Sequence, residues 1–235
     1  PVTTRPCPPS LPEERPPTPD TQHPAPASSA RGILPTSLQP LQRLEPSAGD
    51  TTSRPATWLF KAEARDVLAF GSAIHGLFER IEWLDGTDIE AAIAEWQHVA
   101  TVSPAVTRDA LTQFRDAIAA PNVRRALTRP KGPTRLWREK RFHFIRDDRL
   151  VSGVFDRVAI TLDHEAHPVA ATILDYKSDR VADDAEIATA VDRHREQLIL
   201  YVEALSRILT LPIDQITAQL LFPRPGRVID VPLSS

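Results

Sequence analysis

Two predicted strands carry polar residues at positions where a buried strand usually has apolar ones. Asp156 interrupts the valine-containing run Gly153–Arg157, and Asp175 and Lys177 end a second apolar run. Because side chains alternate between the two faces of a strand, Asp175 and Lys177 share one face and Tyr176 points to the other. If the two strands lie side by side, the two carboxylates approach each other closely.

Two close carboxylates repel each other and raise a pKa unless a cation lies between them. A divalent metal would remove that conflict, and hard oxygen ligands favour Mg2+ or Mn2+. Lys177 would then add a positive charge suited to orienting a water molecule or stabilising an anionic transition state. Phosphodiester hydrolysis needs these groups. The alternative is a structural ion pair between Asp175 and Lys177 at the end of a strand.

The segment before these strands has the apolar spacing of helices. Apolar residues recur at helical intervals between residues 59 and 128, in the stretches 67–84, 89–100 and 105–120. Asp85-Gly86 and Ser103-Pro104 mark the breaks between them. The sequence therefore predicts a helical segment that precedes the strands.

After Pro133 the apolar pattern changes to alternation. Strands are predicted over residues 136–145, 150–162 and 169–178, followed by a long helix over 185–209 and two short strands over 216–222 and 226–233. We expect an α/β fold with a mixed central sheet flanked by helices, in which an antiparallel hairpin adjoins a central strand.

The first 57 residues differ in composition from the rest of the chain. Fourteen of the 23 prolines fall within residues 1–58, and all 14 aromatic residues lie from Trp58 onward. Without large apolar side chains, burial cannot outweigh the loss of chain entropy. We therefore expect a proline-rich disordered linker over residues 1–57 and one globular domain over 58–235. Because the chain starts at Pro1 and has no Met, we expect it to be part of a longer protein.

Several function classes lack their sequence signals. No apolar run approaches the roughly 20 residues of a membrane span, and no signal peptide is evident, so a cytoplasmic location is expected. The single cysteine, Cys7, excludes an internal disulfide, a cysteine-ligated zinc site and a four-cysteine iron–sulfur cluster. The GxxxxGK[ST] loop of ATP-driven motors is missing from this sequence.

Positive charge gathers just before and within the predicted hairpin. Residues 124–149 include ten basic and three acidic residues. This stretch is either a solvated connector or a surface that contacts phosphates. The candidate DNA-binding residues are Arg124, Arg125, Arg129, Lys131, Arg135, Arg138, Lys140 and Arg141.

Five motifs, taken in order, resemble the PD-(D/E)xK nucleases, and specifically the C-terminal nuclease domain of the AddA and RecB helicase-nucleases. They are Gly71–His75, Glu139 within Arg-Glu-Lys-Arg-Phe, Gly153–Arg157, Ile173–Ser178 and Gln197–Tyr201. The resemblance covers about residues 68–232 and implies a restriction-endonuclease-like core. Ser178 stands where the family commonly has Thr, and His194 stands where it often has Tyr.

The resemblance also implies roles for individual residues. His75, Asp156 and Asp175 would hold the metal together with the backbone carbonyl of Tyr176, and Lys177 would position the attacking water. Gln197 and Tyr201, one helical turn apart, would line the active site or the DNA groove.

Two further residues are candidates for supporting this site. Glu139 either reaches the site or forms a salt bridge with Arg157 or Lys140. Arg157 either contacts a phosphate or neutralises the acidic cluster.

The resemblance implies a Mg2+-dependent exodeoxyribonuclease, in which Mn2+ can substitute, that hydrolyses single-stranded DNA during double-strand break repair and recombination. Its expected partners are DNA, a helicase domain in the same parent chain or in a separate subunit, and a partner nuclease or recognition subunit. The related branches that carry an iron–sulfur cluster use four cysteines, which this domain lacks. The alternatives are a catalytically inactive nuclease-like DNA-binding or interaction module, and a freestanding nuclease.

Overall fold

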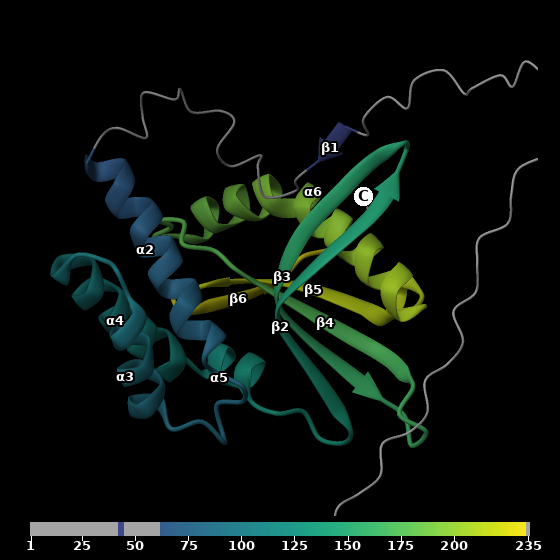
Figure 1. Cartoon of the computed structure of the whole chain (residues 1–235), viewed down its shortest axis with the longest axis horizontal. Coiled ribbons are helices and arrows are strands. Elements are labelled where there is room, and N and C mark those ends of the chain that lie inside the picture. The colour runs from purple at the N-terminus through teal and green to yellow at the C-terminus, as the bar shows by residue number, and fades with distance from the viewer. Residues whose placement is uncertain (1–41, 45–61, 234–235) are drawn as a thin grey trace, which may run out of the picture. The chain divides into compact units, whose positions relative to one another are not determined.

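The computed structural model describes residues 42–44 and 62–233 (Figure 1). Most of the predicted linker, residues 1–57, lies outside these described residues. Within it, Gln42–Leu44 form strand β1, which pairs in parallel with Arg149–Val151. The sequence did not predict this strand, because three residues are too few to show a periodic apolar pattern.

The described residues 62–233 begin with the predicted helical segment. The helices are α2 (Ala62–Glu79), α3 (Ile89–Val99), α4 (Pro104–Ala119) and the short α5 (Pro121–Leu127). Asp88 and Ser103 cap α3 and α4, because their side-chain oxygens accept hydrogen bonds from backbone N–H groups in the first turn. Among the described residues, none of the helices has the length and apolar character that a membrane span needs.

The strands form the predicted mixed sheet. The hairpin consists of β2 (Thr134–Arg146) and β3 (Arg149–Leu162); β4 (Pro168–Tyr176), β5 (Ile216–Phe222) and β6 (Arg227–Asp230) follow. β3 is antiparallel to both β2 and β4, whereas β4 and β5 are parallel. The connection from β4 to β5 contains the long helix α6 (Asp184–Leu209) and a 3-10 turn at Ile213–Gln215. The prediction of a mixed α/β fold with helices before the sheet is confirmed.

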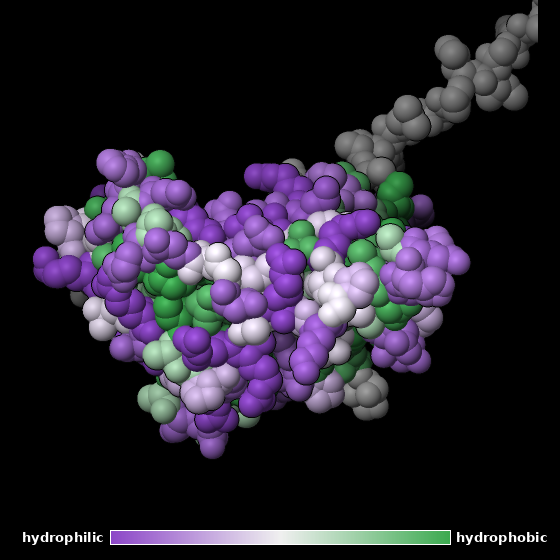
Figure 2. All heavy atoms as spheres, turned by 90° about the horizontal axis from the view of Figure 1, so that it is seen from below, coloured by the Kyte–Doolittle hydropathy of each residue, from purple (hydrophilic) through white to green (hydrophobic). Residues whose placement is uncertain are grey.

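Two apolar cores lie against opposite faces of the sheet. Ile173 and Leu198 belong to the core between the sheet and α6. Leu174 and Phe78 belong to the core between the sheet and helices α2 to α5. Neighbouring residues of β4 thus serve different cores, as strand alternation requires. On the face seen in Figure 2, apolar side chains form separate patches between hydrophilic side chains.

Side-chain alternation breaks within β2. Trp137 and Phe142 both pack on the core that faces α6, although their odd spacing would place them on opposite faces of a regular strand. Glu139 lies between them with a φ of 46°, a left-handed backbone conformation that is uncommon for residues other than glycine. The strand therefore changes face at Glu139.

The same break occurs at the facing position of β3. Phe155 and Val158 are three residues apart and also share the core that faces α6. The paired register of the two strands omits Asp156 and Glu139 while their neighbours on both sides remain paired. Both strands thus change face at the same level of the hairpin, and this irregularity places two carboxylates together.

Candidate functional site

Helix α2 places His75 against the end of β4. His75 Nε2 lies 3.0 Å from the backbone carbonyl oxygen of Tyr176, and the two rings meet edge to face. One turn earlier, a Cβ on Gly71 would lie 3.0 Å from Ser178 Oγ, so glycine permits the close approach of α2 to the chain after β4. Burial lowers the pKa of His75, which favours the neutral imidazole that binds metals.

Asp156 occupies the irregular position of β3 and is 8% exposed. Its Oδ2 accepts a 2.7 Å hydrogen bond from the backbone N–H of Tyr176 and lies 3.6 Å from His75 Nδ1. Burial, together with the nearby charge of Asp175, raises the pKa of Asp156 well above its usual range. Asp156 and Asp175 therefore interact electrostatically, as expected if β3 and β4 lie side by side.

Asp175 near the end of β4 and Lys177 just beyond it form a 2.8 Å ion pair. Lys177 Nζ also donates a 2.8 Å hydrogen bond to Gln197 Oε1 on α6. The amide of Gln197 in turn donates to Tyr201 Oη at 3.0 Å and reaches Asp175 Oδ1 at 3.5 Å. Gln197 and Tyr201 therefore hold the ion pair from the adjacent helix, and the Tyr176 ring packs on the other face.

Glu139 reaches the site because of the change of face in β2. Potential ligand atoms of His75, Glu139 and Asp156 all lie within 4.8 Å of one another. Burial and the charge of Asp156 raise the pKa of Glu139 to about 7. In the described part of the chain, Glu139 Oε1 is buried without a hydrogen-bond partner.

These donors suit a hard divalent cation. They comprise one imidazole nitrogen, carboxylates and the Tyr176 carbonyl, a set in which oxygen predominates. His75 Nε2 and the Tyr176 carbonyl oxygen are hydrogen-bonded at 3.0 Å. A bound ion would replace this hydrogen bond with little movement, because adjacent ligands in an octahedral shell with bonds of about 2.1 Å are also about 3 Å apart. The unpartnered Oε1 of Glu139 is a further available oxygen. The residues present therefore fit a Mg2+ or Mn2+ ion.

Arg157 contacts the helical segment. Its guanidinium is buried and donates hydrogen bonds to the backbone carbonyls of Ile81 and Glu82, just beyond the end of α2. It also lies over the Trp83 ring, 4.8 Å from the ring centroid. The guanidinium therefore binds the helical segment to the sheet, and a contact of Arg157 with a phosphate or with the acidic cluster stays a prediction.

The basic stretch is divided among several elements. Arg124 and Arg125 lie on α5, Arg129 and Lys131 lie in the connection to β2, and Arg135, Arg138, Lys140 and Arg141 lie on β2. Arg129 pairs with Glu82, and Arg124 donates to the Ile118 carbonyl. Lys140 lies over the Trp137 ring and, among the described residues, forms no salt bridge with Glu139, which was one of the two alternatives for that carboxylate.

A hydrogen-bonded pair of side chains, His194 and Asp179, lies next to Lys177 and was not predicted. His194 on α6 is 3% exposed and lies 3.1 Å from Asp179 Oδ2, which follows β4. Although burial opposes it, the hydrogen bond from His194 and the charge of Arg193 lower the pKa of Asp179. A histidine within the buried stripe of the long helix was the available sequence signal for this contact.

Comparison with known proteins adds no further guide to this site. No protein-family model matches the chain, and no curated protein matches it. Function is therefore inferred from the geometry of the site and from the five motifs.

Proposed function

We propose that this domain is a metal-dependent nuclease that hydrolyses phosphodiester bonds. One observation carries the proposal: ligand atoms of His75, Glu139 and Asp156 lie within 4.8 Å of one another where the hairpin changes face. Buried Asp175, whose charge helps to raise the pKa of Asp156, pairs with Lys177 next to this group. A purely structural ion pair between Asp175 and Lys177 would not need a second buried carboxylate beside it. A buried carboxylate such as Asp156, whose pKa is raised by burial and by a neighbouring carboxylate, is instead typical of functional sites.

The metal ligands in this proposal are His75, Asp156, Asp175 and the carbonyl of Tyr176, with Glu139 as an additional ligand. A bound divalent cation would neutralise phosphate charge and lower the pKa of a bound water molecule. The backbone N–H of Tyr176 holds Asp156 in place through the 2.7 Å hydrogen bond.

Lys177 supplies the positive charge that faces the substrate phosphate. Its Nζ is held by Asp175 and by Gln197, each at 2.8 Å, so the ammonium group is oriented before the substrate arrives. An ammonium group in this position orients the attacking water and stabilises negative charge as it develops on the phosphate oxygens. Tyr201 fixes the amide of Gln197 through its hydroxyl group.

The five motifs support a narrower form of the proposal. By their resemblance to the AddA and RecB nuclease domain, the substrate is single-stranded DNA and the reaction is exonucleolytic. The physiological process is double-strand break repair and recombination, in which a helicase domain delivers the strand and a partner nuclease or recognition subunit assists. A cytoplasmic location follows from the same proposal.

The test is cleavage of an end-labelled DNA oligonucleotide with Mg2+, with Mn2+ and with EDTA. The wild-type protein should cleave only with a metal, and Asp175→Asn and Lys177→Ala should each reduce the rate by about 100-fold or more. Asp192→Asn, an exposed partner of Arg195 on α6, is the matched control and should retain the wild-type rate. Oligonucleotide binding without cleavage would support the inactive DNA-binding module instead. Unchanged cleavage by Asp175→Asn would refute the mechanism.

A further inference from the structure

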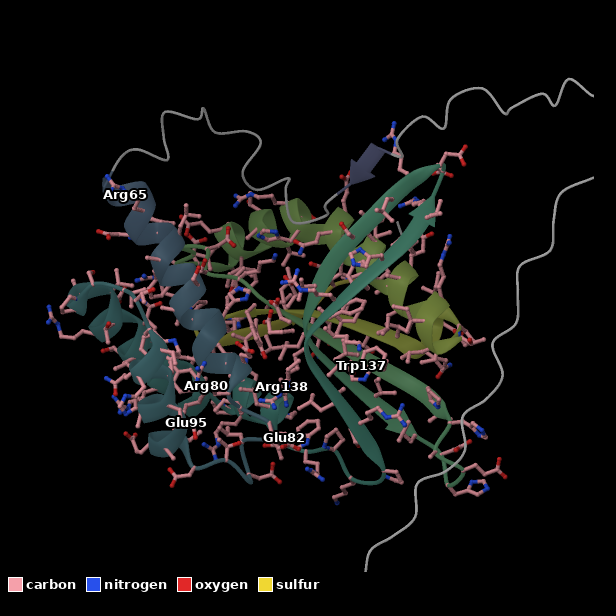
Figure 3. The ribbon with its side chains drawn as sticks, in the orientation of Figure 1. Arg65, Arg80, Glu82, Glu95, Trp137 and Arg138 are labelled. Atoms are coloured by element: carbon pink, nitrogen blue, oxygen red, sulfur yellow. The ribbon has the colours of Figure 1, made fainter. Side chains whose placement is uncertain are left out.

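A cleft of about 700 Å³ crosses the outer edge of β2. Among the described residues, β2 pairs only with β3, so its other edge is not covered by a strand. The lining includes Glu79, Arg80 and Glu95 from α2 and α3 and Trp137, Arg138 and Lys140 from β2. Figure 3 shows Trp137 and Arg138 pointing to opposite sides of the strand, so the cleft passes around the strand edge.

The cations of this cleft keep their positive charge available. Arg80 donates to the Gly76 carbonyl and Arg138 donates to the Glu79 carbonyl, and hydrogen bonds to neutral carbonyls do not neutralise a charge. In the described part of the chain, neither arginine forms an ion pair, and Lys140 forms none either. Arg129 differs, because it pairs with Glu82.

The cleft also offers an aromatic ring. Trp137 is only partly buried, with its apolar side packed against the core that faces α6. Lys140 Nζ lies 5.7 Å from the centroid of the Trp137 ring. Proteins that bind single-stranded nucleic acids use such a combination, because bases stack on aromatic rings while cations contact the backbone.

The cleft lies next to the proposed metal ligands. Glu139 lies between Arg138 and Lys140 in the chain, and the charge of Glu79 on the cleft wall contributes to the raised pKa of Glu139. A chain of nucleotides in the cleft would therefore pass directly beside the carboxylate cluster.

We propose that this cleft binds a single strand of DNA, with one base stacked on Trp137 and its phosphates in contact with Arg80, Arg138 and Lys140. The substrate class rests on the proposed nuclease function. The three cations outnumber the two carboxylates of the lining, Glu79 and Glu95, which suits a polyanion. A cavity of this size holds about one or two nucleotides, and stacking on Trp137 requires a base that is free of its duplex partner.

The test measures binding without cleavage, using fluorescence anisotropy of a labelled oligothymidylate in EDTA. Trp137→Ala should weaken binding by about tenfold, within the range for loss of one stacked base, whereas Trp137→Phe should retain most of the affinity. Lys140→Ala should reduce the slope of log affinity against log salt by about 0.7. Arg108→Ala on α4 removes an exposed arginine that does not line the cleft, and its salt slope should match the wild type.

A double-mutant cycle separates stacking from any loss of stability in Trp137→Ala. An oligonucleotide with abasic sites should bind the wild type more weakly than oligothymidylate, but should bind Trp137→Ala about as well as oligothymidylate does. The proposal would be overturned if removing the bases weakened binding to the wild type and to Trp137→Ala by the same factor. It would also be overturned if folded Trp137→Ala bound oligothymidylate with wild-type affinity. Because the assay contains no metal, a positive cycle in a protein that never cleaves DNA would refute the nuclease and leave the binding cleft standing.

Discussion

Asp156 Oδ2 accepts a 2.7 Å hydrogen bond from the backbone N–H of Tyr176, and this contact joins β3 to the end of β4. The carbonyl of the same tyrosine lies 3.0 Å from His75 Nε2 on α2. The backbone of Tyr176 therefore positions proposed metal-ligand atoms from α2, β3 and β4. The proposed metal ligands are preorganised by the backbone, so a bound ion should stabilise the fold.

Mn2+ is expected to raise the Tm of the wild-type protein and to have a much smaller effect on His75→Ala. At a concentration 100 times its Kd, a ligand that binds only the folded state adds about 2.7 kcal/mol of stability. Thermal unfolding with and without Mn2+ measures this difference. His98→Ala removes an exposed histidine on α3 and should retain the wild-type shift in Tm. An equal shift in His75→Ala would remove His75 from the ligand set.

In metal-free buffer, the contribution of Glu139 to stability should fall as the pH rises from about 4.5 to 7, the interval between its ordinary and its raised pKa, whereas the lowered pKa of His75 acts in the opposite direction. The folded protein retains a proton in this interval that the unfolded chain releases, so the free energy of unfolding decreases with pH. After allowance for the partial solvent exposure of its side chain, Glu139 should lower the free energy of unfolding by roughly 1 kcal/mol across this interval. Urea denaturation at several pH values measures the slope.

Glu139→Gln should flatten this pH dependence, because the amide does not titrate. Glu90→Gln on α3 removes an exposed carboxylate that pairs with Arg115 and is the matched control. Equal slopes for Glu139→Gln and the wild type would show that Glu139 does not carry the effect.

Gln197→Leu is expected to lower the cleavage rate by about tenfold to 100-fold while the oligonucleotide affinity stays within about twofold, because the amide positions Lys177 without touching the substrate. Tyr201→Phe should have a smaller effect in the same direction, since it removes one hydrogen bond to that amide. Single-turnover rates and anisotropy measure the two quantities. A loss confined to affinity would place Gln197 in the DNA groove instead.

Arg157→Met should destabilise the fold by about 3 kcal/mol or more, because the carbonyls of Ile81 and Glu82 lose a buried, charged donor. Arg135→Met, at an exposed position of β2, is the control and should change stability by less than about 0.5 kcal/mol. Urea denaturation compares the variants. Folded Arg157→Met with wild-type stability but weakened DNA binding would support the phosphate-contact interpretation.

Periodicity in the sequence predicted most of the fold. The apolar spacing of residues 67–120 corresponds to α2, α3 and α4, and the alternation after Pro133 corresponds to β2, β3 and β4. These elements have enough residues to display a period, and each buries one side against a core. β1 has three residues and depends on pairing with β3, so local sequence carries no sign of it.

The site was predictable where it follows strand alternation. The shared face of Asp175 and Lys177 is a consequence of their spacing, and the structure places them in an ion pair. The position of Glu139 was not predictable, because it depends on a positive φ in a residue other than glycine. The contacts of Arg157 depend on carbonyls about 75 residues earlier in the chain, which no local pattern reveals.

The proposed metal site lies between the layers that pack on the two faces of the sheet, so a bound ion should make these layers unfold more cooperatively. His75 belongs to the helical layer, whereas Lys177 and Gln197 meet on the side of α6, so the ligands and their supports come from both sides of the sheet. A bound ion would couple the opening of these two layers. Native-state hydrogen exchange should therefore show separate protection levels for α2 and α6 in metal-free protein, and a single common level once Mn2+ is bound.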